Sequence, residues 1–164
     1  MAVDMNRFRA VANSFNNIKI GLDSIPPISS RGMWEAYIGT ITVLTQKFEN
    51  VKMSMYDLIS QIESSNEFTK EEKAKFKSQL NEKINKMISI LKSKKNEFEA
   101  AAEKFGFITR EKVIKQKLDY DGRAHDVAEV KTKEDPRIDA LRSAFNKSSI
   151  TYTNGWLDLE SIGI

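Results

Sequence analysis

Residues 34–62 read WEAYIGTITVLTQKFENVKMSMYDLISQI, and apolar side chains recur in them every seven residues. One column consists of Trp34, Ile41, Phe48, Met55 and Ile62, and a second column consists of Tyr37, Leu44, Val51 and Leu58. These columns match the two core positions of a heptad repeat, which places them along one seam of a helix. We therefore predict one long amphipathic helix over this stretch.

A second helical stretch follows after a short break at residues 64–66. Its apolar columns are Ile84, Leu91, Phe98 and Phe105, and Leu80, Met87 and Ala101, with Lys94 interrupting the second. Thr69 and Glu72 have the spacing of a capping box, in which the two side chains satisfy backbone donors at the start of a helix. Residues 34–105 are thus predicted to form a long antiparallel helical hairpin of the coiled-coil type.

A shorter helix is predicted before the hairpin, over residues 4–20. Its apolar face, at steps of three and four residues, comprises Met5, Phe8, Val11, Ala12, Phe15 and Ile18. Gly21 favours a helix end, and Pro26 and Pro27 require an extended connection. We expect this N-terminal helix to brace the hairpin within a helical domain of residues 1–106.

The pattern changes after Gly106, which suits the residue that closes a helix. Residues 109–117 fit a short helix, but Ile114, Leu118 and Tyr120 would also share one face of a strand. A turn at residues 121–122 and a strand at 127–130 follow. Asp135 and Pro136 then predict a helix start. Its buried face would carry Ile138, Leu141 and Phe145.

The C-terminal stretch predicts a β-hairpin around the Asn154-Gly155 turn. The expected pairs are Thr153 with Trp156, Tyr152 with Leu157, Thr151 with Asp158, and Ile150 with Leu159. Residues 107–164 would therefore form a small α/β appendage that ends in this hairpin. The fold class expected for the whole chain is mainly α.

Composition excludes several classes of site. The chain has no cysteine and one histidine, so disulfides, thiolate metal sites and thiol nucleophiles are ruled out. The 26 Lys and Arg residues nearly balance the 23 Asp and Glu residues, which disfavours an obligate nucleic-acid binder. We expect no cofactor. With no apolar run long enough to span a bilayer and no signal-peptide h-region, we also expect a soluble cytoplasmic or virion protein.

One stretch supports an enzymatic alternative, residues 118–131, which read LDYDGRAHDVAEVK. An acidic residue near a turn, followed by Glu129-x-Lys131 on a strand, resembles the core signature of the PD-(D/E)xK nucleases. The resemblance implies that Asp119 or Asp121, together with Glu129, would hold a divalent cation while Lys131 helps to position the attacking water. No proline precedes either aspartate, in contrast to the family pattern.

The second arm of the hairpin carries many lysines, which offers another alternative, nucleic-acid binding. They are Lys70, Lys73, Lys75, Lys77, Lys83, Lys86, Lys92, Lys94 and Lys95. Glutamates are interspersed among them, and mixed charges at helical spacing are typical of a solvated face.

The preferred hypothesis is a non-enzymatic structural or assembly protein. The hairpin has more aromatic surface than one seam can bury, so either the rest of the chain or other subunits must cover it. The candidate interaction residues are Trp34, Tyr37, Tyr152, Trp156 and Leu157. The expected partners are copies of this chain or other protein subunits, and a component of a phage or virus particle is one instance of this class.

Overall fold

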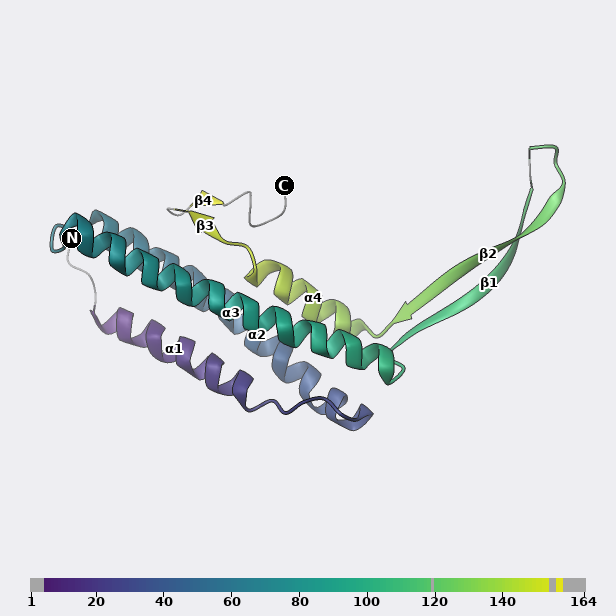
Figure 1. Cartoon of the computed structure of the whole chain (residues 1–164), viewed down its shortest axis with the longest axis horizontal. Helices are drawn as coiled ribbons and strands as arrows, with labels where there is room; N and C mark the ends of the chain where they lie inside the picture. The colour runs from purple at the N-terminus through teal and green to yellow at the C-terminus, as the bar shows by residue number, and fades with distance from the viewer. Residues whose placement is uncertain (1–4, 119, 154–155, 158–164) are drawn as a thin grey trace.

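A computed structural model of the chain describes residues 5–118, 120–153 and 156–157. The elements in order are α1 (Met5–Asp23), α2 (Arg31–Ser64), α3 (Lys70–Lys104), β1 (Ile108–Leu118), β2 (Ala124–Glu134), α4 (Pro136–Ser148), β3 (Tyr152–Thr153) and β4 (Trp156–Leu157). The described helices form one elongated body, and β1 and β2 project from one end of it (Figure 1). The fold is mainly α with an antiparallel β-hairpin at residues 108–134.

α2 is the central helix of this body, because it packs against α1, α3 and α4. The predicted columns of α2 are buried or half-buried, and Trp34, Ile41 and Phe48 have no exposed surface. A second buried stripe at seven-residue spacing lies beside them and consists of Ile38, Thr45, Lys52 and Ile59. Lys52 in this stripe contacts the end of α4. α2 therefore buries two stripes rather than the single predicted seam.

The predicted start of α3 is confirmed in detail. The Thr69 hydroxyl accepts a hydrogen bond from the Glu72 amide at 3.1 Å, and the Glu72 carboxylate accepts one from the Thr69 amide at 3.2 Å. This is the reciprocal arrangement of a capping box. The break between α2 and α3 is therefore fixed by its own side chains, and α3 runs back along α2 (Figure 1).

α4 belongs to the helical body. Its start is as predicted, with the Asp135 carboxylate accepting a hydrogen bond from the Arg137 amide at 2.9 Å and Pro136 in the first turn. Ile138 and Leu141 are each 1% exposed and lie in the same apolar core as the buried residues of α2 and α3. The apolar core thus includes residues on both sides of residue 106, where the sequence analysis placed the limit between the helical domain and the appendage.

Two of the four strand pairs predicted for the C-terminal hairpin lie in the described residues. Tyr152 pairs with Leu157 and Thr153 pairs with Trp156 in antiparallel register. The predicted turn at Asn154-Gly155 lies outside the described residues, as do Asp158 and Leu159.

Among the helices that the structure describes, none combines the length and the apolar composition needed to cross a lipid bilayer.

Candidate interaction surface

The hairpin of β1 and β2, with the tip between them, forms an arm that leaves the helical body (Figure 1). The two strands pair without interruption from Ile108 opposite Glu134 to Leu118 opposite Ala124. Each has 11 residues, so the paired region is about 35 Å long at the rise of a β-strand. Residues 109–117, for which the sequence allowed either a short helix or a strand, therefore form a strand.

One face of the arm is apolar and exposed. Residues directly opposite each other in an antiparallel pair share a face, so Ile114 lies beside Ala128 and Leu118 beside Ala124. Ile114, Leu118 and Val130 are 65%, 74% and 67% exposed. We call these five residues the apolar face. The polar residues on this stretch of the face are Gln116 and Asp126, which are opposite each other, and Lys112, which is opposite Val130.

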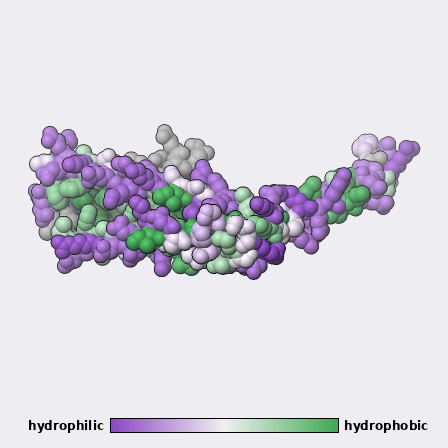
Figure 2. Space-filling view, turned by 60° about the horizontal axis from the view of Figure 1, so that its bottom comes forward, coloured by the Kyte–Doolittle hydropathy of each residue, from purple (hydrophilic) through white to green (hydrophobic). Residues whose placement is uncertain are grey.

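The opposite face of the arm is covered by charged side chains. Glu129 lies 3.3 Å from the Lys115 ammonium and 3.0 Å from that of Lys117. Hydrogen bonds from Lys117 and Lys115 to the Glu129 carboxylate lower its pKa from the ordinary value. Val113 and Val127 on this face are half-buried. The arm is thus an amphipathic ribbon whose apolar face is uncovered, as the hydrophobic surface along the arm in Figure 2 illustrates.

The tip of the arm presents an aromatic ring. Tyr120 has a relative exposure of 104%, so its side chain is fully accessible to solvent. Gly122 has φ of 79°, in the left-handed region that glycine adopts without strain. The turn predicted at residues 121–122 is therefore present, and Tyr120 lies beyond the last strand pair, Leu118 with Ala124, at the end of the ribbon.

An aromatic stack fixes the start of the arm to the body. The rings of Trp34 and Phe107 stack with centroids 3.9 Å apart, and the Trp34 indole donates a hydrogen bond to the Phe98 carbonyl at 2.9 Å. The Arg31 guanidinium lies 4.3 Å from the Phe107 ring centroid and donates to the Phe105 carbonyl at 2.6 Å. Trp34, expected at an interaction surface, lies instead inside the chain and anchors the residue that precedes β1.

A second set of contacts fixes the other strand. The Arg142 guanidinium of α4 pairs with Glu134, the last residue of β2, and with Glu99 of α3 at 2.8 Å. The Asp135 amide donates to the Phe107 carbonyl at 2.9 Å, which joins the two ends of the arm. Both strands are therefore held at the body, and the direction in which the arm leaves it is set by these contacts.

The carboxylates of the nuclease-like motif are spread along the arm. Asp121 is in the tip, whereas Glu129 lies five residues beyond Ala124 on β2, roughly 17 Å at the strand rise. Lys131 is opposite Glu111. Asp119 lies outside the described residues. In the described part of the chain, no three His, Asp or Glu side chains come together as a metal ion would require.

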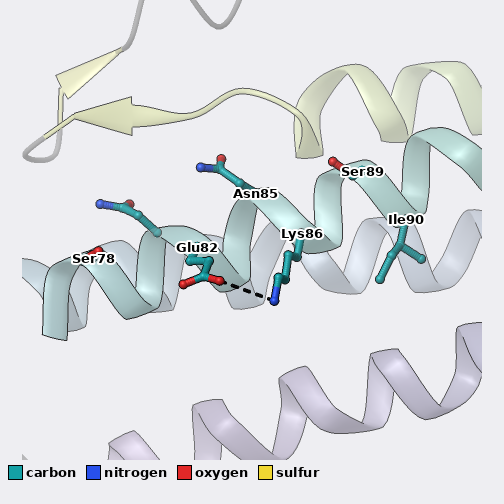
Figure 3. A pocket seen from close by; sticks show the side chains of 7 residues that line it. Ser78, Glu82, Asn85, Lys86, Ser89 and Ile90 are labelled. Carbon is teal, nitrogen blue, oxygen red and sulfur yellow. Dashed lines mark ion pairs between the residues drawn. The ribbon is translucent and has the colours of Figure 1, made fainter. Parts of the chain in front are cut away.

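The lysines of α3 do not gather on one surface, and the shallow surface along this helix includes Lys86 alone among them. Figure 3 shows Ser78, Glu82, Asn85, Lys86, Ser89 and Ile90 along it. Lys86 pairs with Glu82 at 3.4 Å. Lys77 and Lys95 likewise pair with Glu63 and Glu99, at 3.1 Å and 3.4 Å. Much of the positive charge here is balanced locally, which is the arrangement of a solvated face.

The remaining predicted interaction residues lie apart from the arm. Tyr37 on α2 is half-buried against the apolar core. Tyr152, Trp156 and Leu157 are in β3 and β4, and their side chains lie outside the described part of the structure. The sequence analysis placed the nuclease-like alternative on residues of the arm but did not identify the arm as an interaction surface, although it put Ile114, Leu118 and Tyr120 together on one face of a possible strand.

Comparison of the chain with protein-family models, with curated proteins and with solved structures gives no match.

Proposed function

We propose that this protein is a non-enzymatic structural or assembly protein that associates with copies of itself through the arm. The observation that carries the proposal is the exposure of Ile114, Leu118 and Val130 on one face of a ribbon whose base is fixed to the body. A soluble monomer gains nothing by holding large apolar side chains away from its own core.

Energetic considerations support this use of the arm. A two-stranded ribbon is marginally stable in water, and packing against another element is what usually stabilises it. Burying one large aliphatic side chain contributes about 1.5–3 kcal/mol, so covering the apolar face would stabilise both the ribbon and the complex. Because the base of the arm is already ordered, docking costs less conformational entropy than it would for an unstructured segment.

The C-terminal β3–β4 pair supplies a second contact in this proposal. A hairpin of two-residue strands is too short to be stable alone, so it would pack on its own helices or on a neighbouring copy. The helical hairpin then serves as the rigid spacer between contact points. A subunit of a larger particle, such as that of a phage or virus, is a setting that fits this role.

The experiment is to shorten the arm between two residues that are paired across the strands, and to measure self-association of the shortened chain by light scattering. Lys112 and Val130 are opposite each other, so residues 113–129 can be replaced by Asn-Gly, the preferred two-residue turn. We expect the wild-type chain to associate with rising concentration and the shortened chain to stay monomeric. The matched control is Lys92→Ala, on exposed α3 surface. A wild-type chain that is monomeric at all concentrations would contradict the proposal.

A further inference from the structure

An apolar groove lies between α1, α2 and α3. Its volume is about 140 Å³. The apolar part of its lining is Phe8, Val11, Ala12, Phe15, Met55, Leu58, Phe76 and Leu80, and the polar part is Asn16, Gln79 and Lys83. These residues belong to the first two thirds of α1, the second half of α2 and the first half of α3, so the groove lies toward the end of the body opposite the arm (Figure 1).

The groove has the size of one aromatic ring. An apolar cavity of about 150 Å³ in a protein accommodates a benzene molecule. The hydrophobic surface that Figure 2 shows over this end of the body is bordered by hydrophilic surface. This arrangement suits a ring that carries one polar atom, because the ring is covered by apolar side chains while the polar atom stays at the border. A tyrosine has this character.

The charges around the groove favour an acidic partner. Arg7 of α1 pairs with Asp57 of α2, so its charge is balanced, whereas Arg9 lies on the same helix in a stretch, residues 5–16, that contains no acidic residue. The Lys83 ammonium on the α3 side lies 6.0 Å from the Phe15 ring centroid. A ligand segment with carboxylates next to its aromatic ring would therefore be attracted to this end of the body.

The tip of the arm has the matching chemistry. Tyr120 is fully exposed and is flanked in the sequence by Asp119 and Asp121. Lys117 and Arg123 lie two residues outside these carboxylates, so the carboxylates are next to the ring although residues 117–123 carry no net charge. The arm holds this aromatic tip away from its own body, and the groove of the same chain lies toward the other end, so the occupant that this arrangement favours is the tip of another copy.

We propose that Tyr120 of one copy inserts into the groove between α1, α2 and α3 of the next copy. Its ring would pack on Phe8, Phe15 and Leu80, and its hydroxyl would lie near Asn16 and Gln79. This contact joins two different surfaces, so it is head-to-tail and builds a ring or a filament, depending on the rotation between copies. The inference rests on the proposed function and specifies the surface that the arm binds.

A head-to-tail contact can be tested by complementation between two defective variants. Tyr120→Ser removes the ring but leaves the groove intact. Ala12→Trp fills the groove but leaves the arm intact, since Ala12 is an exposed residue of its lining. We expect each variant alone to associate at least about 10-fold more weakly than the wild type, as for loss of an aromatic anchor. Mixed together, they should form a one-to-one dimer in sedimentation velocity.

The controls separate docking from folding. Tyr120→Phe keeps the ring and should associate within a few-fold of the wild type, and Asn13→Trp adds the same bulk to α1 outside the groove and should have no effect. Helical circular dichroism should be unchanged in all four variants. Each variant is compared with wild type and with the arm-shortened chain in the same experiment.

The possible results distinguish this inference from the proposed function. If arm shortening abolishes association but Tyr120→Ser and Ala12→Trp do not weaken it, the arm binds elsewhere on the partner copy and the inference is wrong, while the proposed function stands. If both variants are monomeric and their mixture is also monomeric, the head-to-tail contact is excluded. A wild-type chain that never associates contradicts both proposals.

Discussion

The ammonium group of Lys52 lies 2.7 Å from the carbonyl oxygen of Ile150, at a position with no exposed surface. It also donates to the carbonyls of Lys147 and Ser148, at 3.0 Å and 3.2 Å, and lies 2.8 Å from the Glu49 carboxylate. The last carbonyls of a helix have no partner within the helix. A lysine from the middle of α2 therefore caps α4 and attaches its end to the body.

We predict that Lys52→Met destabilises the protein by about 3 kcal/mol, because it leaves buried carbonyls of α4 and a carboxylate without their partner. Urea denaturation followed by circular dichroism measures the change in the free energy of unfolding. Lys47→Met, at an exposed position of the same helix, is the control and should change it by less than about 0.5 kcal/mol. Equal changes in the free energy of unfolding for the two substitutions would show that the contacts of the Lys52 ammonium do not stabilise the fold.

The contact between α2 and α3 should respond to truncation of single side chains. Phe48 has no exposed surface and Leu91 is 1% exposed, so Phe48→Ala and Leu91→Ala should each cost about 2–5 kcal/mol. Chemical denaturation gives these values. A loss below about 0.5 kcal/mol at either position would mean that the side chain is not in a packed core.

The contact of α3 with α4 predicts a dependence of stability on pH. Burial raises the pKa of Glu99, but the hydrogen bond from Arg142 and the charges of Lys95 and Arg142 outweigh it and lower the pKa below the ordinary 4.5. A carboxyl group with a lowered pKa stabilises the folded state above its unfolded pKa, and this is lost as the pH falls through the folded pKa. Between pH 7 and values below 4.5, Tm should fall less steeply in Glu99→Gln than in wild type. The control is Glu71→Gln, at an exposed position of α3. Parallel curves would contradict the prediction.

We predict that the protein does not cleave nucleic acids. Purified chain incubated with magnesium or manganese should leave DNA and RNA intact, since Glu129 is engaged by Lys115 and Lys117 and lies far along the strand from Asp121. Cleavage that disappears in both Glu129→Ala and Lys131→Ala would restore the nuclease alternative.

The helices were predictable from sequence because each carries a strong local signal. The heptad columns mark α2 and α3, the pair Thr69 and Glu72 marks the start of α3, and Asp135 with Pro136 marks the start of α4. The second stripe of α2 was not predicted, because Thr45 and Lys52 interrupt it and polar residues are normally read as exposed. Only the end of α4, brought from a distant part of the chain, makes Lys52 a buried residue.

The arm was only partly predictable. A strand is recognised by alternation between an apolar buried face and a polar exposed one, and both faces of β1 and β2 are largely exposed. The turn at Gly122 and the shared face of Ile114 and Leu118 were visible, but the length of the pairing depends on contacts between two strands. The groove could not be predicted at all, because three helices distant in sequence build it.

The most direct test of the central claim is the dissociation constant for self-association, measured by sedimentation equilibrium. Ile114→Ser removes an apolar side chain from the exposed face of the arm, and Val113→Ser makes a comparable change on the charged face next to it. We predict that Ile114→Ser weakens association at least about 10-fold, the equivalent of about 1.4 kcal/mol, and that Val113→Ser changes it little. Equal dissociation constants for wild type and Ile114→Ser would contradict an assembly contact on this face.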